Sequence, residues 1–188
     1  RNCLMDRNKI FRDLKASIDI HYPEAQCKLY LLHGDMTDQE MHALYKHEKI
    51  KAFVCLSHGE GYGLPFFEAM YNELPVVAAG WSGQCDFLFR GTEEAFYNVG
   101  FDLQPVPENA VWDGVIQADS QWAYANQGSF KMSLRQMYKK IDQFKDQSSQ
   151  LQNYVNNNFN NKVLYEKFCS AILEEDPMNS LIDLESLL

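Results

Sequence analysis

"KAFVCLSHGEGYGLPFFEAMYNELPVVAAG", residues 51–80, contains two apolar runs separated by a glycine-rich loop and a helical stretch. The first run, residues 51–57, predicts a strand, because parallel strands that are buried on both faces are apolar throughout. Pro65 suits the first position of a helix that we expect to continue to about Asn72. Residues 75–80 predict a second strand. This order of strand, loop, helix and strand is the repeating unit of a parallel α/β fold.

The same alternation continues on both sides of this stretch. The further expected elements are a helix over residues 5–22 capped by Asp6, a buried strand over 27–33 closed by Gly34 and Asp35, a short helix opened by a Thr37–Glu40 capping box, a short helix over 84–89 and a strand over 95–103. Four strands therefore alternate with helices, which predicts a Rossmann-like parallel sheet with helices on both faces.

The character of the chain changes after Pro107. Residues 112–127 form an aromatic stretch that we expect to be irregular, and from Ser129 to about Glu175 the pattern is helical. An asparagine-rich piece in this part predicts a break between helices. The last long helix carries an apolar stripe typical of a helix packed against another element, formed by Leu164, Phe168, Ala171 and Ile172. We expect one domain over 1–175 and a loosely held tail over 176–188.

Composition excludes several classes of function. The chain has 188 residues with 17 basic and 26 acidic side chains and a net charge of -9, which argues against nucleic acid as a partner. It shows no signal-peptide pattern and no apolar run near the roughly 18 residues of a transmembrane segment. Five cysteines, spread widely without a C-x-x-C pair, favour a reduced, cytoplasmic protein.

The glycine loop has the properties of an anion site. Ligands of open α/β sheets bind at the carboxyl ends of the strands, where this loop begins. Gly61 and Gly63 permit positive φ angles and let a ligand approach the backbone closely. The backbone N–H groups at the start of the following helix then form a site for a phosphate or diphosphate.

Two carboxylates flank this loop. Glu60 precedes it and Glu68 lies in the helix, and each can accept two hydrogen bonds from a sugar diol. The loop is neither a Walker motif nor the dinucleotide fingerprint, so a nucleotide sugar fits better than ATP or NAD. Neither His nor carboxylate residues show the spacing of a metal site, and we expect no metal.

These residues carry a family resemblance. EGYGLPFFE, residues 60–68, fits the E-x7-E motif of retaining glycosyltransferases of the GT-B architecture, family four, and resembles their EGFGLPxLEA loop. NELPVVAAGWSGQCDFL, residues 72–88, resembles their G.PVVA...GG..E segment. The resemblance covers about residues 34–88. It implies the C-terminal, donor-binding half of a GT-B fold, followed by C-terminal helices.

The resemblance also implies roles for single residues. Glu60 would be the catalytic residue that orients the transferred sugar, and Glu68 would hold the ribose hydroxyls. The backbone amides that would cover the diphosphate and the sugar are those of Gly61, Tyr62, Gly63 and Leu64, and the residues that would hold the base are Gly34, Asp35 and Met36. The donor would be a UDP- or GDP-linked sugar, with no further cofactor.

Other residues near the loop leave two interpretations open. Ser82, Gly83 and Gln84 either reach the donor or only cap the helix that follows. His58 either contacts the donor sugar or fills a polar gap at the end of its strand. We expect Tyr62 to line the sugar site through its backbone while its ring packs. Core or interface residues are the more frequent role, compared with stacking platforms, for Trp81, Trp112, Trp122 and Tyr124.

One departure from the family pattern concerns the leaving diphosphate. The family places an Arg and a Lys near its first strand, but no strand precedes the Asp6 helix, and Arg1, Arg7 and Lys9 do not match that pair. We therefore expect the donor half of a two-domain enzyme whose N-terminal acceptor domain is missing, inactive alone. The acceptor would be a glycan, a lipid or a protein. The alternatives are a GT-B-type epimerase or phosphorylase, and a non-catalytic nucleotide-sugar-binding module.

Overall fold

The computed structural model describes residues 4–174, apart from the side chains of residues 4, 142–148 and 174. The chain divides into two compact units, Arg1–Leu44 and Tyr45–Leu188, and each is described by itself. The expected tail over 176–188 lies outside the described residues.

The first unit contains the first two helices that the sequence predicts, except for Tyr45, the last residue of the second helix, which belongs to the second unit. Helix α1 covers Leu4–His21, so that Asp6 lies in its first turn instead of preceding it. Helix α2, Asp38–Tyr45, begins with the predicted capping box. The backbone N–H of Thr37 donates to Glu40 Oε2 at 2.8 Å, and Thr37 Oγ1 accepts from the N–H of Glu40 at 3.2 Å. The Thr37 hydroxyl also donates to Glu40 Oε2, at 3.0 Å. The backbone N–H and the hydroxyl of Thr37 thus both donate to the Glu40 carboxylate and lower its pKa, because they favour its charged form.

The predicted strand over 27–33 is wrong. These residues have no regular secondary structure, and Leu29, Tyr30 and Leu32 are exposed. A strand satisfies its backbone N–H and C=O groups through a neighbouring strand, and within the described part of the chain this segment has no such neighbour. Cys27 is accordingly an exposed free thiol rather than a small buried residue.

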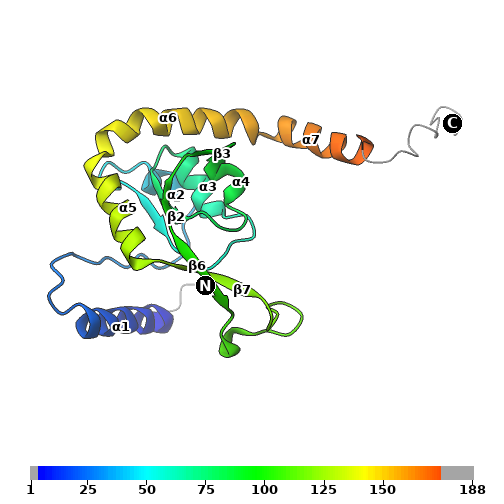
Figure 1. Ribbon diagram of the computed structural model, residues 1–188. Helices are drawn as coiled ribbons and strands as arrows, with labels where there is room; N and C mark the ends of the chain where they lie inside the picture. The colour runs from blue at the N-terminus through cyan, green and yellow to red at the C-terminus, as the bar shows by residue number, and fades with distance from the viewer. Residues whose placement is uncertain (1–3, 175–188) are drawn as a thin grey trace, which may run out of the picture. The chain divides into compact units, whose positions relative to one another are not determined.

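The second unit is built on a parallel three-stranded sheet of order β1-β2-β5. The strands are β1 (Phe53–Cys55), β2 (Val76–Ala79) and β5 (Tyr97–Val99). All residues of β2 are buried, so both faces of the central strand are covered. Helix α3 (Leu64–Tyr71) connects β1 to β2 and packs against α6. The α/β fold with a parallel sheet flanked by helices is confirmed (Figure 1).

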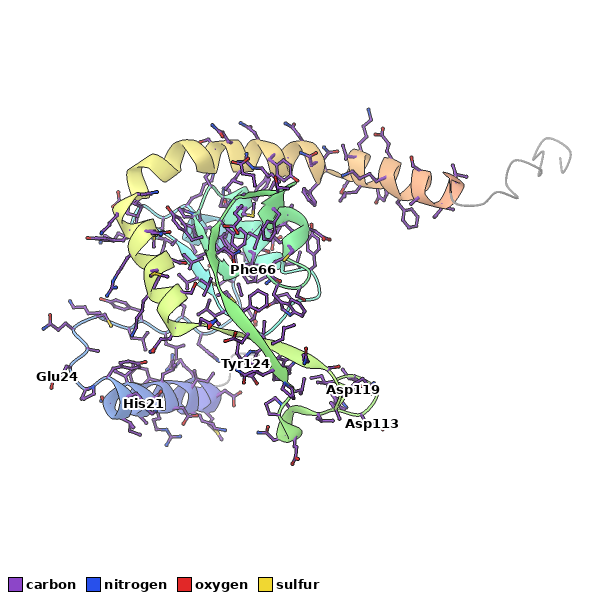
Figure 2. All side chains as sticks on the ribbon, viewed as in Figure 1. His21, Glu24, Phe66, Asp113, Asp119 and Tyr124 are labelled. Atoms are coloured by element: carbon purple, nitrogen blue, oxygen red, sulfur yellow. The ribbon has the colours of Figure 1, made fainter. Side chains whose placement is uncertain are left out.

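Aromatic rings fill the core around α3. The ring of Phe66 is 1% exposed and meets Phe53 of β1 edge to face, with ring centroids 5.2 Å apart. Phe67 packs in the same way on Phe87, at 5.4 Å. Figure 2 shows Phe66 among the packed side chains of this unit. The core therefore fixes the direction of α3, whose first turn follows the glycine loop.

The predicted strand over 95–103 is two strands of different sheets. The first of the two, β5, ends at Val99. After Gly100 the chain forms β6 (Phe101–Pro105), which pairs antiparallel with β7 (Gln121–Ala125). Residues 121–125 are thus not irregular as expected. The β6–β7 hairpin, residues 101–125, projects from the sheet (Figure 1). The sequence prediction also missed a short hairpin of β3 (Phe89–Arg90) and β4 (Glu93–Glu94), which follows the predicted short helix α4 (Cys85–Leu88).

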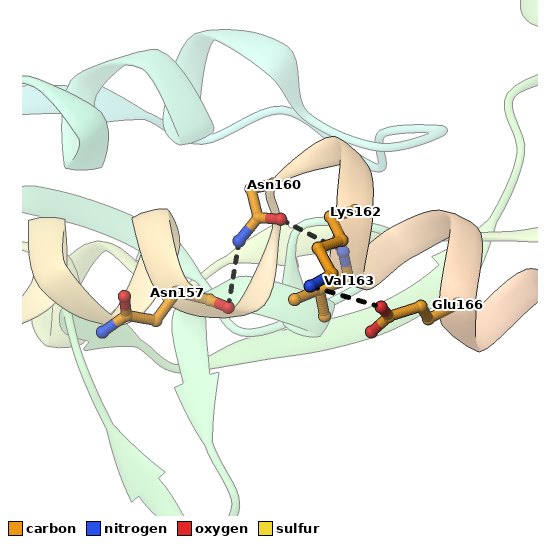
Figure 3. Close-up of polar contacts among 5 residues, drawn as sticks. All are labelled: Asn157, Asn160, Lys162, Val163 and Glu166. Carbon is orange, nitrogen blue, oxygen red and sulfur yellow. Dashed lines mark hydrogen bonds and ion pairs between the residues drawn. The ribbon is translucent and has the colours of Figure 1, made fainter.

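The C-terminal part is helical, as predicted, with α5 (Gln127–Lys139), α6 (Ile141–Asn158) and α7 (Asn161–Glu174). The break between α6 and α7 is confirmed in the asparagine-rich piece, where Asn160 caps both helices (Figure 3). Its Nδ2 donates to the carbonyl oxygens of Asn156 and Asn157, and its Oδ1 accepts from the N–H of Val163 at 3.1 Å.

The apolar stripe of α7 is not packed as the sequence predicts. Phe168 is 65% exposed and Ile172 is 56% exposed. Figure 1 shows α7 continuing past the end of α6, away from the sheet. Amphipathic spacing indicates that a face can be buried, but it does not indicate which element buries it.

Candidate functional site

The glycine loop, residues 56–63, leads from the carboxyl end of β1 into α3. Gly63 precedes the first helical residue with φ of 90°, a left-handed conformation that favours glycine. A Cβ atom there would also lie 3.0 Å from Gln84 Cβ and 3.1 Å from the Phe66 ring. Both the backbone and the packing therefore require glycine. Pro65 is the second helical residue, one position later than the sequence suggests.

The start of α3 keeps several backbone donors unpaired. The N–H groups of Phe66 and Phe67 donate to Gly63 O at 3.0 and 3.1 Å. Across residues 4–174 no acceptor meets the N–H groups of the preceding stretch, Gly61–Leu64, and the helix has no side-chain cap. Unpaired N–H groups at the positive end of a helix favour an anionic ligand.

A second loop, residues 80–84, follows β2 and holds the glycine loop in place. Ser82 Oγ donates to Glu60 O at 2.7 Å and accepts from the N–H of Glu60 at 3.1 Å. The N–H of Gly83 donates to the same carbonyl at 3.1 Å. A Cβ atom on Gly83 would lie 2.2 Å from Gly61 O, so only glycine lets the two backbones approach this closely.

The second loop thus serves the glycine loop as well as the helix that follows. Ser82 O also accepts from the N–H of Cys85, which supports the capping interpretation for this residue. Gln84 is 1% exposed, and its Nε2 donates to Ala79 O at 3.2 Å, so its side chain acts as internal support. Direct contact of Ser82, Gly83 or Gln84 with a donor stays a prediction.

The two glutamates differ in their surroundings. Glu60 is half-buried and its backbone is fixed by Ser82, whereas its carboxylate has no partner in the described part of the chain. Glu68 is exposed on α3, and its Oε2 accepts from the hydroxyl of Tyr45 at 3.3 Å. Sequence reasoning missed Tyr45, because it lies in another helix and belongs to no motif.

The hydroxyl of Tyr45 remains a proton donor over a wide pH range. Burial, followed by the charge of Glu68 and the hydrogen bond to it, raises the pKa of Tyr45 to about 12. The hydroxyl also lies 3.5 Å from Pro65 O. It therefore engages one oxygen of the Glu68 carboxylate and leaves Oε1 available to a ligand.

Of the remaining predicted site residues, three lie in the first unit, and Tyr62 and His58 lie in the second. Gly34, Asp35 and Met36 belong to the first unit, so their contact with a base stays a prediction. The Tyr62 ring packs between Phe67 and Phe87, with ring centroids 5.9 and 5.2 Å away, as the packing interpretation expects. Burial, and then the charge of Asp86, raises the pKa of this tyrosine. His58 packs against the β6–β7 hairpin and is described further below.

A hollow of about 570 Å³ lies elsewhere on this unit. It is an open groove at the amino ends of the strands, where Lys51 precedes β1 and Pro75 precedes β2. The glycine loop lies at the opposite, carboxyl ends of the same strands. The loop is the better candidate for a ligand site, because open α/β sheets bind ligands at the carboxyl ends of their strands.

No group of three or more His, Cys, Asp or Glu side chains that could hold a metal ion occurs in the described residues. Over the same residues, none of the helices has the length and apolar character needed to span a bilayer.

Comparison with known protein families gives a match to part of the chain. Residues 14–95 match the model of the family "Glycosyl transferases group 1". The matched range contains both loops and both glutamates, and it ends before β5 and the β6–β7 hairpin. No curated protein and no solved structure matches the chain significantly. The match indicates glycosyl transfer as the general function of this segment.

Proposed function

We propose that this chain is the donor-binding part of a retaining glycosyltransferase of the GT-B architecture, acting on a UDP- or GDP-linked sugar. The observation that carries the proposal is the glycine loop itself. Four amides that no residue within 4–174 pairs lie at the positive end of α3 between Glu60 and Glu68, and a second loop holds them in place. The family match over 14–95 supports the same class of reaction.

Different residues bind the different parts of the donor. The amides of Gly61–Leu64 bind the diphosphate and stabilise the negative charge that develops on it as the sugar leaves. Glu68, oriented by Tyr45, accepts hydrogen bonds from the ribose hydroxyls through its available oxygen. Glu60 orients the sugar, so that the acceptor oxygen bonds to the anomeric carbon on the face from which the diphosphate leaves. The bond from that carbon to the diphosphate oxygen breaks, and the departing diphosphate takes the proton of the acceptor hydroxyl. The acceptor, a glycan, a lipid or a protein, would be presented by a separate N-terminal domain.

The proposal is tested by saturation-transfer NMR with a panel of UDP- and GDP-linked sugars. We expect saturation of the ribose and of the sugar protons nearest the diphosphate, and none with the free sugar alone. Addition of EDTA should leave the spectra unchanged. Absence of binding to every nucleotide sugar, or binding that requires Mn²⁺, would contradict the proposal.

A further inference from the structure

The β6–β7 hairpin holds His58 through both its backbone and its ring. The N–H of Ala123 donates to His58 O at 3.2 Å, and His58 Nδ1 lies 2.8 Å from Ala123 O. The imidazole stacks on the Trp122 indole with ring centroids 5.0 Å apart and planes 6° apart. The Tyr124 ring lies 4.4 Å away on a tilted plane. In Figure 2 Tyr124 lies near the base of the hairpin, while Asp113 and Asp119 lie toward its far end.

These contacts select one tautomer of His58. A carbonyl oxygen only accepts hydrogen bonds, so Nδ1 must carry the proton in the bond to Ala123 O. In the neutral imidazole Nε2 is then an acceptor without a proton. None of the described residues forms a hydrogen bond with Nε2.

His58 is also fixed relative to Glu60. The hairpin holds residue 58, and Ser82 with Gly83 holds the backbone of residue 60 from the other side. The imidazole and the Glu60 carboxylate therefore come from a three-residue segment that is anchored at both ends. Such anchoring is what a binding site needs to keep its side chains in a productive geometry.

We propose that His58 contacts a hydroxyl group of the transferred sugar through Nε2, and that the β6–β7 hairpin is the positioning element that sets this tautomer. The inference rests on the proposed function. A deprotonated phosphate offers no proton to an unprotonated nitrogen, whereas a sugar hydroxyl does, so the chemistry favours the sugar over the diphosphate. The hairpin lies outside the matched range 14–95, so this role is not part of the family match.

A pair of variants separates the two nitrogens. In His58→Asn the side-chain amide can still donate to Ala123 O, but nothing occupies the place of Nε2. We expect roughly five- to tenfold weaker binding of the nucleotide sugar, with the affinity for the free nucleoside diphosphate unchanged. The melting temperature should fall slightly, because the stacking of the ring on Trp122 is lost. His58→Gln places an amide near the position of Nε2 and should recover part of the loss. Equal nucleotide-sugar affinity in wild type and His58→Asn would overturn the hydroxyl contact.

The positioning role is tested in the full chain by nitrogen-15 NMR of the His58 ring. We expect protonated Nδ1 and unprotonated Nε2 in the wild type, a mixture of tautomers in Trp122→Ala, and the wild-type state again in Trp122→Phe. The control is Trp112→Ala, a residue between the same two strands that is 66% exposed. A proton on Nε2 in the wild type would overturn the tautomer that Ala123 O sets. A Trp122→Ala spectrum like the wild type would overturn the part of the Trp122 ring in holding the imidazole against that carbonyl.

The two proposals can fail separately. If the wild-type chain binds no nucleotide sugar, the proposed function and the hydroxyl contact are both refuted. The nitrogen-15 spectrum still decides whether the hairpin sets the tautomer of the His58 ring. If the wild type binds but His58→Asn binds equally well, the proposed function stands and the hydroxyl contact falls.

Discussion

The two ends of helix α3 are built in opposite ways. At the carboxyl end the backbone N–H of Asn72 donates to the carbonyls of Glu68 and Ala69, and Asn72 Nδ2 donates to Glu68 O at 2.8 Å. The N–H of Leu74 then donates to Ala69 O. At the amino end no side chain caps the helix, and the amides of Gly61–Leu64 are unpaired among the described residues.

This difference suggests that the carboxyl end of α3 serves folding stability and the amino end serves ligand binding. The carboxyl end satisfies its own carbonyls and is largely buried, so its residues contribute to the free energy of folding. The amino end retains unpaired donors, and a neighbouring loop, rather than a cap, holds it in place. A local departure from good capping is expected where a ligand completes the hydrogen bonds. Substitutions at the two ends should therefore have different readouts.

Gly83→Ala should have the largest effect. Its Cβ would lie 2.2 Å from Gly61 O, so the two loops must separate. We expect the free energy of unfolding to fall by about 2–3 kcal/mol, together with loss of nucleotide binding. Denaturant titration and calorimetry measure the two effects.

Gly61→Ala is the matched control for this variant. A Cβ atom on Gly61 would meet nothing within 4 Å, so the unfolding free energy should stay close to that of the wild type. Binding of the diphosphate should weaken, since the methyl group points into space that the ligand would use. Equal destabilisation by both variants would show that the loops are not packed as described.

Glu68→Gln should weaken binding of a free nucleoside diphosphate roughly ten- to a hundredfold, because charge-assisted hydrogen bonds contribute about 1.5–3 kcal/mol. Glu60→Gln should leave that affinity nearly unchanged, since its proposed partner is the sugar, and should weaken binding of only the complete nucleotide sugar. Calorimetry with both ligands measures this, with the melting temperature as a check on folding. Similar losses for the free diphosphate would refute this division of roles.

Asn72→Ala tests the carboxyl end of α3. It removes the hydrogen bond from Nδ2 to Glu68 O, and we expect a loss of about 1 kcal/mol in the free energy of unfolding. Affinity for the nucleoside diphosphate should not change. A clear loss of binding without a loss of stability would mean that the two ends of the helix are not separate in function.

Tyr45→Phe should change the response to alkaline pH. The pKa of Tyr45 is about 12 in the folded chain against 10 in its ordinary state, so the folded chain holds this proton more tightly. The resulting stabilisation is fully present below pH 10 and is lost as the pH rises toward 12. The stability difference between wild type and Tyr45→Phe should shrink over that range. Urea titrations at pH 9 and at pH 11 measure it, and an unchanged difference would contradict the assigned pKa.

Two similar apolar runs show how far the sequence predicts the fold. Residues 27–33 and 51–57 both read as buried strands, and each run leads into a histidine and a glycine, His33–Gly34 in the first and His58–Gly59 in the second. Only the second contains a strand, where Phe53 pairs with Val76. An apolar run indicates that a segment can be buried, but pairing depends on a partner strand that local sequence does not identify.

The site was predictable where it is continuous in sequence. The capping box, the glycine loop and α3 follow from local spacing. The hydrogen bonds from Ser82 and Gly83 to Glu60 O form only because two loops lie side by side in space. Their proximity could have been inferred, since the carboxyl ends of adjacent parallel strands lie at one edge of a sheet. The alternation of side chains in QWAYA, residues 121–125, was the sequence signal from which β7 could have been predicted.

The most direct test of the account is calorimetry of the wild-type chain with a nucleoside diphosphate and with the matching monophosphate. Unpaired amides at a helix start interact more strongly with the greater negative charge. We expect a dissociation constant of about millimolar or tighter for the diphosphate, and roughly five- to thirtyfold weaker binding of the monophosphate. Equal affinity for the two ligands, or no binding of the diphosphate, would contradict the central claim that the glycine loop is a diphosphate site.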